Sequence, residues 1–274
     1  MSQNSQTLPA YTPSPDPKVA ELQDWPKPIV GYTGQYAAGH STGKHSHSRH
    51  QLVHADDGVL TLWTEAGAWV VPPSYAVWVP AGIEHKVRAA APSSMLTLYV
   101  RPESGIPVGP HCRVVSVSEL VRELIRRVVS YPETYPEDGA EARLLAVLGD
   151  ELSELEVAPL ELPLPKDRRA LAVAEQLIIS PGAGLELGEW AKRVGASERT
   201  LARLFKLETG LTFGRWRQQR RLIAALEMLA GGSSVTTVAF DLGYQTPSAF
   251  VAMFRRALGV SPTRYLKEAS DPTG

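Results

Sequence analysis

The sequence predicts a two-domain α+β protein. An N-terminal β-barrel with a helical pair is expected first, followed by a C-terminal all-α domain with a double helix-turn-helix. Two observations support this fold class. Short segments with period-two alternation fill residues 51–101, as in a small barrel or a double-sheet jelly roll. From residue 187 onward the periodicity is helical, and a pair of short helices around a glycine turn occurs twice.

Composition sets the class of protein before any motif is considered. The 274 residues, 43% hydrophobic and 21% charged, are typical of a globular protein with a sizeable core. No apolar run reaches the roughly 18 residues of a membrane span, and the first residues lack a signal-peptide pattern, so we expect a cytoplasmic protein. The single cysteine, Cys112, excludes an internal disulfide framework and a cysteine-based zinc finger.

The N-terminal domain is expected to begin after a tail. Residues 1–24 are polar and proline-rich, with too little apolar surface to offset the entropy of ordering them, so they are predicted to form a flexible tail. The barrel is assigned to residues 25–108. Its first two strands flank Asp57-Gly58, a dipeptide that favours a hairpin turn. The expected strand segments are residues 51–55, 59–64, 68–71, 76–79, 85–88 and 95–100.

Residues 109–156 are predicted to form the helical pair. The first helix, which begins near Ser118, has Leu120, Leu124 and Val128 on one stripe. The pair either covers the barrel or packs against a second protomer in a homodimer. Residues 157–166 contain three prolines, which bar a regular helix, so this segment is the expected linker. The second helix of the pair carries a leucine face made by Leu144, Leu145, Leu148, Leu152 and Leu155.

Residues 167–274 are assigned to the helix-turn-helix domain. In the first unit a helix opens at Ser197, whose hydroxyl can cap it. In the second unit Thr246 is the cap and Pro247 takes the first helical position. From Lys166 to the end there are 16 Lys and Arg against 10 Asp and Glu, whereas the preceding residues have 12 against 19. The basic half is therefore the half expected to face phosphates.

The helical half resembles the AraC/XylS family of bacterial transcription regulators. The resemblance is carried by residues 195–210 (GASERTLARLFKLETG), 220–229 (RRLIAALEML) and 238–265 (VAFDLGYQTPSAFVAMFRRALGVSPTRY). It implies a seven-helix fold in which a helix over about residues 213–230 holds two recognition helices apart. It also implies double-stranded promoter DNA as the partner, with RNA polymerase as a candidate further partner.

Two recognition helices on one frame can enter successive major grooves about one turn of DNA apart. On the first helix, Leu201, Leu204 and Phe205 are expected to face inward. Arg199 and Arg203 match positions where the family contacts bases, and the alternative for each is a solvated or phosphate-bound arginine. The candidate DNA-binding residues of this helix are Arg199, Thr200, Arg203 and Lys206.

The second recognition helix is expected to discriminate bases less well than the first. Its core side is assigned to Phe250, Phe254 and Leu258, and the outward residues near its start are small. We expect it to use thymine methyl contact, DNA shape and phosphate contacts. Its candidate DNA-binding residues are Gln245, Ser248, Ala249, Ala252, Arg255 and Arg256.

Histidines surround the predicted barrel strands. His45 and His47 precede the first clear strand, and His85 follows the fourth. Two histidines at i and i+2 on a strand project to the same side, and a third from a neighbouring strand can complete a site for a transition metal. This arrangement resembles the cupin superfamily, whose metal-binding histidines these three match. Gln51 stands where that superfamily usually has a glutamate ligand.

Three interpretations of this cluster remain open. It is a site for one divalent transition metal, alone or with a ligand; or a metal-free pocket in which histidines bond a small organic effector; or a set of histidines satisfied by backbone at a barrel mouth. No other cofactor is expected. Trp63 and Trp78 are predicted to line the effector cavity. The glutamine at position 51 weakens the case for an iron oxygenase, which needs a carboxylate.

Taken together, these features predict a ligand- or metal-responsive DNA-binding transcription regulator that is not an enzyme. The alternative from another class is a cupin-type metal-dependent dioxygenase or isomerase with a DNA-binding domain. A third hypothesis is a DNA-binding protein whose barrel only drives oligomerisation.

Overall fold

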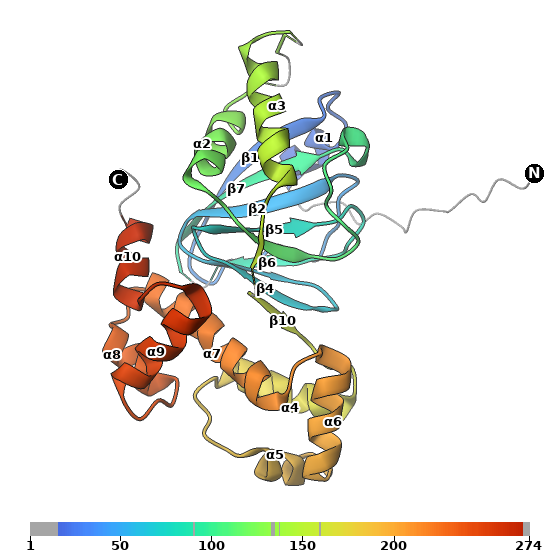
Figure 1. The fold of residues 1–274 in the computed structure, drawn as a ribbon. Coiled ribbons are helices and arrows are strands. Elements are labelled where there is room, and N and C mark those ends of the chain that lie inside the picture. Colours follow the sequence, from blue (N-terminus) through green and yellow to red (C-terminus); the bar gives the residue numbers. More distant parts are fainter. Residues whose placement is uncertain (1–15, 90, 133–134, 137, 159, 271–274) are drawn as a thin grey trace, which may run out of the picture. The chain divides into compact units, whose positions relative to one another are not determined.

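The computed structural model describes residues 16–89, 91–132, 135–136, 138–158 and 160–270. The chain divides into two compact units (Figure 1). The sheet unit comprises residues 1–65 and 69–159, and the helical unit comprises residues 66–68 and 160–274. The predicted two-domain α+β class is therefore confirmed. None of the helices in the described residues is long and apolar enough to cross a membrane.

Two sheets carry the strands of the described residues. The larger has six strands in the order β1-β7-β2-β5-β8-β9, and the smaller has four in the order β10-β4-β3-β6. The larger sheet contains β1 (Ile29–Tyr36), β2 (His50–Asp57), β5 (Tyr75–Val79), β7 (Ser93–Val100), β8 (Arg113–Ser116) and β9 (Val157–Ala158). The smaller sheet contains β3 (Leu60–Trp63), β4 (Gly67–Val71), β6 (Lys86–Ala89) and β10 (Glu161–Pro163).

Strand register decides which side chains share a face of the larger sheet. Leu52 on β2 lies opposite Leu98 on β7 and Trp78 on β5, and these three belong to one buried apolar cluster. The next residue, Gln51, lies opposite Tyr99, and both line a cavity on the other face. Because successive side chains in a strand point to opposite faces, register separates an apolar face from a polar one.

The expected hairpin at Asp57-Gly58 is wrong. Gly58 has a φ of +75°, as a tight turn requires, but β2 pairs with β5 and β7, whereas β3 pairs with β6 in the other sheet. Both edges of β2 are already occupied, and its register with β7 shifts between Ala55 and Asp57. The turn therefore carries the chain from one sheet to the other.

The helical pair packs on the apolar face of the larger sheet. It consists of α2 (Glu119–Val128) and α3 (Ala140–Ser153), which lie across the strands in Figure 1. The buried residues of α2 are Val121, Ile125 and Val128, so the predicted stripe is displaced, and Leu120 is 52% exposed. The leucine face of α3 packs into the same cluster as intramolecular core, through Leu145, Leu148 and Leu152.

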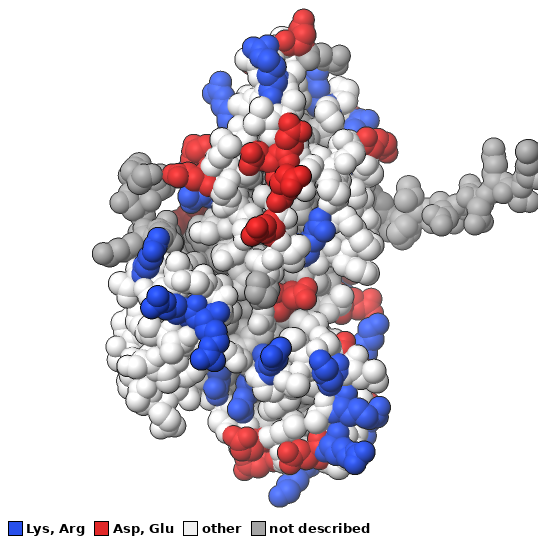
Figure 2. Space-filling model, viewed as in Figure 1, with Lys and Arg blue, Asp and Glu red and all other residues white. Residues whose placement is uncertain are grey.

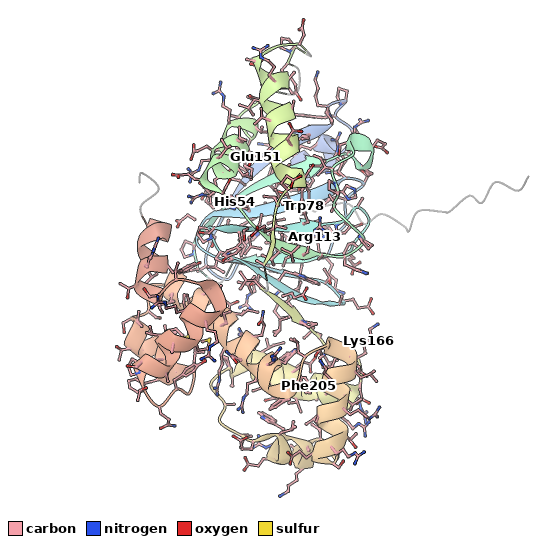
Figure 3. All side chains as sticks on the ribbon, viewed as in Figure 1. His54, Trp78, Arg113, Glu151, Lys166 and Phe205 are labelled. Atoms are coloured by element: carbon pink, nitrogen blue, oxygen red, sulfur yellow. The ribbon has the colours of Figure 1, made fainter. Side chains whose placement is uncertain are left out.

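A fully buried histidine, His54 on β2, lies on the face of the sheet that α2 covers (Figure 3). Its Nδ1 is 2.9 Å from the carbonyl oxygen of Tyr75. Burial lowers the pKa of His54 to about 4; the Tyr75 carbonyl and the Asp56 carboxylate oppose this shift, and Arg122 and Arg126 add to it. The imidazole is therefore neutral at pH 7.

Replacing His54 by glutamine is expected to make the sheet unit less sensitive to acid. The unfolded histidine takes up a proton near pH 6.5, whereas the buried one does so only near pH 4, so the wild type loses stability as the pH falls between these values. This proton uptake costs the wild type about 2 kcal/mol between pH 7 and pH 5. Urea unfolding at both pH values measures it, with exposed His111→Gln as the control. An equal acid loss in wild type and His54→Gln would contradict the prediction.

The expected flexible tail is wrong for its last residues, because α1 (Pro17–Leu22) is a helix with Val19 and Leu22 buried. Asp16 caps it, and Pro17 occupies its first turn. The earlier part of the tail, residues 1–15, lies outside the described residues. An N-cap aspartate followed by proline was a readable start signal in the sequence.

Arg49 holds the segment that follows α1 against the sheet unit. Its side chain is 2% exposed, and its guanidinium donates to the carbonyl oxygens of Gln23 at 3.1 Å and Lys27 at 2.8 Å, and to that of Trp25. Buried charges need such hydrogen bonds to be tolerated. This role cannot be predicted from the sequence, because main-chain carbonyls are the partners and every residue has one.

The expected linker, residues 157–166, is extended but contains strands. It contributes β9 to the larger sheet and β10 to the smaller one. Within the helical unit, the indole Nε1 of Trp216 donates to the carbonyl oxygen of Pro163 at 2.7 Å. The backbone N–H of Lys166 donates to Oε2 of Glu208 at 2.7 Å. These bonds fix the end of the segment to the helices.

The described residues of the helical unit contain the seven helices that the resemblance implied. Trp190, Trp216 and Tyr265 are buried core aromatics, as expected. The long helix has the predicted bounds, Phe213 to Ala230. The helices are α4 (Arg168–Ile179), α5 (Leu187–Arg193), α6 (Glu198–Thr209), α7 (Phe213–Ala230), α8 (Val235–Asp241), α9 (Pro247–Leu258) and α10 (Pro262–Ser270).

Candidate nucleic-acid interface and metal centre

The first recognition helix is α6, the second helix of the α5–α6 unit. Ser197 caps it by accepting from the N–H of Thr200 at 3.1 Å. Leu201, Leu204 and Phe205 are buried, as the periodicity predicted. The opposite side of α6 is therefore free to face a ligand.

The four candidate residues of α6 differ in their surroundings. Arg199 and Arg203 are exposed, so their guanidinium groups can reach a groove. Thr200 is half-buried, and its hydroxyl lies 2.9 Å from that of Ser197. Lys206 is exposed, but its Nζ donates to the carbonyl oxygen of Gly210 at 2.8 Å and so caps the end of the helix. Arg199 and Arg203 are thus exposed, whereas the polar groups of Thr200 and Lys206 lie in hydrogen-bonding contact with other groups of the chain.

The second recognition helix is α9, which follows α8 through a turn at Gly243. Thr246 caps it through the N–H of Ala249 at 3.2 Å. Phe250 and Phe254 are fully buried, whereas Leu258 is only partly buried. The exposed candidates of this unit are Gln245, Ser248, Ala249, Ala252, Arg255 and Arg256.

The exposed side of α9 is a shallow hollow of about 640 Å³. Its floor has few donors, and its cations lie on the later turns of the helix. Such a surface matches thymine methyl groups and phosphates better than the hydrogen-bonding edge of guanine. The hollow is lined by Pro247, Ser248, Val251, Ala252, Arg255 and Arg256.

Charge is distributed unevenly between the elements. On the face shown in Figure 2, Lys and Arg side chains gather over the helical unit, with a smaller acidic group near α5. Asp and Glu side chains gather over α3 of the sheet unit. The cations of the helical unit suit a phosphate backbone, in agreement with the sequence counts.

The predicted metal histidines lie together in the sheet unit. His45, His47 and His85 are all buried, and one ring nitrogen from each lies within 4.8 Å of the others. The backbones of His45 and His85 pair directly, with N···O distances of 2.9 and 2.8 Å. The ring centroids are 4.5 to 5.2 Å apart. Strand pairing thus brings together residues that are 40 positions apart in the sequence.

Backbone carbonyls fix the orientation of two of these rings. Nδ1 of His45 is 2.7 Å from the carbonyl oxygen of Gly43, and Nδ1 of His85 is 2.9 Å from that of Ile83. Since a carbonyl only accepts, each Nδ1 carries the proton and each Nε2 keeps its lone pair, as in metal-binding histidines. Burial lowers the pKa of His85 to about 4 and that of His47 to about 2, so the rings stay neutral.

Several polar atoms in this cluster lack a hydrogen-bond partner. They are both ring nitrogens of His47, Nε2 of His85 and Oε1 of Gln51, all of them buried. A buried polar atom without a partner is costly, and such atoms commonly mark the place of an ion or a water. Neutral imidazole nitrogens with one amide oxygen form a donor set that fits a divalent transition metal. The residues present therefore fit the expected ion.

A cavity of about 520 Å³ adjoins the cluster. Tyr99, which no motif in the sequence marks, connects Gln51 to His47. Its hydroxyl accepts from Nε2 of Gln51 at 3.1 Å, and its ring centroid is 4.9 Å from that of His47. Only strand register reveals that position. The lining residues include Asp16, Tyr32, Tyr36, His40, His45, Gln51, Met95 and Tyr99.

The two tryptophans expected to line the effector cavity do not lie there. Trp78 is fully buried in the apolar cluster between the larger sheet and the helical pair, on the face opposite Gln51 (Figure 3). Trp63, at the end of β3, is partly exposed and is not among the described residues that line this cavity. The expectation was wrong because alternation marks two faces without saying which one encloses the cavity.

The fold and these sites define a class of protein, a DNA-binding regulator with a sheet-rich ligand-binding unit. Residues 190–268 match the helix-turn-helix domain family, and residues 29–148 match the AraC-like ligand binding domain family. The HTH-type transcriptional regulator NimR of Escherichia coli is 38% identical over 222 residues, which cover 81% of each chain.

Other relatives match a shorter part of the chain. The HTH-type transcriptional regulator RipA of Corynebacterium glutamicum is 38% identical over 103 residues, 38% of this chain and 31% of that protein. The regulatory protein SoxS of Escherichia coli is 37% identical over 76 residues, 27% of this chain and 71% of that protein. The chain belongs to the AraC family and is a ligand-responsive DNA-binding transcription regulator.

Proposed function

We propose that this regulator reads two short promoter segments by placing α6 and α9 in successive major grooves. The observation that carries the proposal is that both units present a capped helix with one buried face and one exposed face. Arg199 and Arg203 of α6 make the specific base contacts, because an arginine can pair bidentately with guanine. α9 contributes through shape, methyl contact and the phosphate contacts of Arg255 and Arg256.

Replacing Arg203 by alanine is expected to weaken binding to the selected promoter site by about 1–3 kcal/mol, because one base pair loses its partner. DNA selected by the purified protein is first sequenced to define the site, which should show two segments about one helical turn apart. Kd values are then measured on that site and on a random duplex of equal length. Binding to the random duplex should change little.

The matched control for this prediction is Arg169→Ala. Arg169 lies on α4, and its Nη2 is 2.9 Å from Oδ2 of Asp167. This variant should bind both duplexes as the wild type does. If Arg203→Ala lost the same affinity on both duplexes, Arg203 would be a phosphate contact rather than a base contact.

The effector side of the proposal is a divalent transition metal held by His45, His47 and His85, with Gln51 as a fourth donor. The neutral, oriented and unpartnered nitrogens support it. Such an ion would supply an open coordination position to a small molecule in the adjoining cavity. An effector changes DNA affinity only if it binds one conformation of the chain better than another. The proposal therefore requires two conformations of the chain in which the metal-loaded cavity differs in its affinity for the effector.

The rival class, a cupin-type enzyme, gains no support from the relatives, which are named as transcriptional regulators. A homodimer remains part of the proposal. Its support is the apolar surface that the helical pair leaves uncovered, where Leu120 is 52% and Val147 is 48% exposed.

A further inference from the structure

A second connection, besides α7, joins the two helix-turn-helix units. Residues 180–186, between α4 and α5, lead directly into the first unit, and Gly182 among them touches the second. A Cβ on Gly182 would lie 2.0 Å from the carbonyl oxygen of Asp241, at the end of α8. Conversely, a Cβ on Gly243 in the α8–α9 turn would lie 2.7 Å from the carbonyl oxygen of Gly182. The two backbones are therefore in direct contact.

Three arginines of α7 bind this segment and its flanks through main-chain carbonyls. Such charge-assisted bonds are stronger than neutral ones. The donors and acceptors are Arg217 Nη1 to Leu185 at 2.9 Å, Arg220 Nη2 to Ile178 at 2.9 Å and Arg221 Nε to Pro181 at 3.3 Å. The segment is thus held between α7 on one side and the end of α8 on the other.

Arg221 continues this connection into the second unit. Its guanidinium carbon is 5.4 Å from the ring centroid of Tyr244, in the turn before α9. The ring of Tyr244 in turn lies 5.6 Å from that of Phe250, the buried anchor of α9. A chain of contacts therefore runs from the entrance of the first unit to the core of the second.

We propose that Gly182 and Arg221 are positioning residues that fix the angle between α6 and α9. The inference rests on the proposed binding of two successive grooves. Two linked modules gain affinity from each other only when geometry allows both to bind at once. A side chain at position 182 would push the segment away from α8, and the two recognition helices would then no longer match the spacing of the grooves.

The test compares Gly182→Ala with Gly184→Ala in the full chain. Neither glycine has a positive φ, so the backbone accepts alanine at both, and a Cβ on Gly184 would meet nothing within 4 Å. Kd is measured on the selected two-segment duplex and on a shorter, one-segment duplex that ends before the α9 segment. We expect Gly182→Ala to lose on the order of 100-fold on the two-segment duplex and almost nothing on the other. Gly184→Ala should match the wild type.

Arg221→Ala is a second test variant. It removes the hydrogen bond from Arg221 to the carbonyl oxygen of Pro181 and introduces no steric clash. It should also lose affinity for the two-segment duplex, by a smaller factor than Gly182→Ala does. Retained binding to the one-segment duplex shows that each variant still has a folded first unit. If the wild type preferred the two-segment duplex and Gly182→Ala preferred it equally, the positioning role would be wrong. If the wild type bound both duplexes equally, the two-groove proposal itself would be wrong, and this inference with it.

Discussion

Alanine in place of His47 is expected to abolish retention of a divalent transition metal by the sheet unit. His47 is the member of the cluster with both ring nitrogens buried and unpartnered, so no hydrogen bond within the described residues competes with a metal for its lone pair. Loss of an outer partner of a metal ligand already costs roughly 10–100-fold in affinity, and loss of the ligand itself should cost more. Metal content after loading and gel filtration in the presence of a weak chelator measures the effect.

Two further variants and the behaviour of the wild type complete this experiment. His85→Ala should behave as His47→Ala does, because it removes another ligand nitrogen. His111→Ala, at an exposed position outside the cluster, should keep the metal. If the wild type retained none of the zinc, cobalt, nickel, copper, iron or manganese offered to it, the metal proposal would be wrong, and the neutral histidines would be left to bond an organic effector directly.

Alanine in place of Trp78 is expected to lower the free energy of unfolding of the sheet unit by about 3–5 kcal/mol. The indole is fully buried against Leu52 and Leu98, where the helical pair covers the larger sheet. Its removal leaves a cavity that fixed strands cannot close. Urea unfolding followed by circular dichroism gives the size of the loss.

Metal retention distinguishes the core-packing role of Trp78 from the cavity-lining role that the sequence predicted for it. Trp78→Ala should still bind metal, because Trp78 and Gln51 lie on opposite faces of the sheet. Trp63→Ala, at a partly exposed position, should be destabilised less. Unchanged stability together with a lost effector response would restore Trp78 to the cavity and contradict its place in the core.

The helical unit was largely predictable because its signals are local. A cap hydroxyl bonds a group three residues away, and a helical face repeats within two turns, so Ser197, Thr246 and Leu201 could each be assigned from nearby residues alone. What could not be predicted was the contact between Gly182 and Asp241, which joins segments far apart in the chain.

The sheet unit was less predictable than the helical unit, because its contacts join segments that are distant in the sequence. Alternation predicts strands but does not identify the partner of a strand, so the hairpin predicted at Gly58 and the cavity position predicted for Trp78 are both wrong. On α2 both Leu120 and Val121 are apolar, so periodicity alone cannot decide which stripe of the helix packs on the sheet.

By itself the sequence determined the two-domain class, the helix caps at Ser197 and Thr246, and the identity of the three histidines, because those depend on residue type and short spacing. The seven helices followed from the resemblance to the AraC/XylS family. The tertiary structure alone decided which faces are buried, that Tyr99 joins Gln51 to His47, and that α1 lines the cavity. These features come from pairing between distant strands, and pairing energy depends on the whole set of neighbours rather than on any one segment.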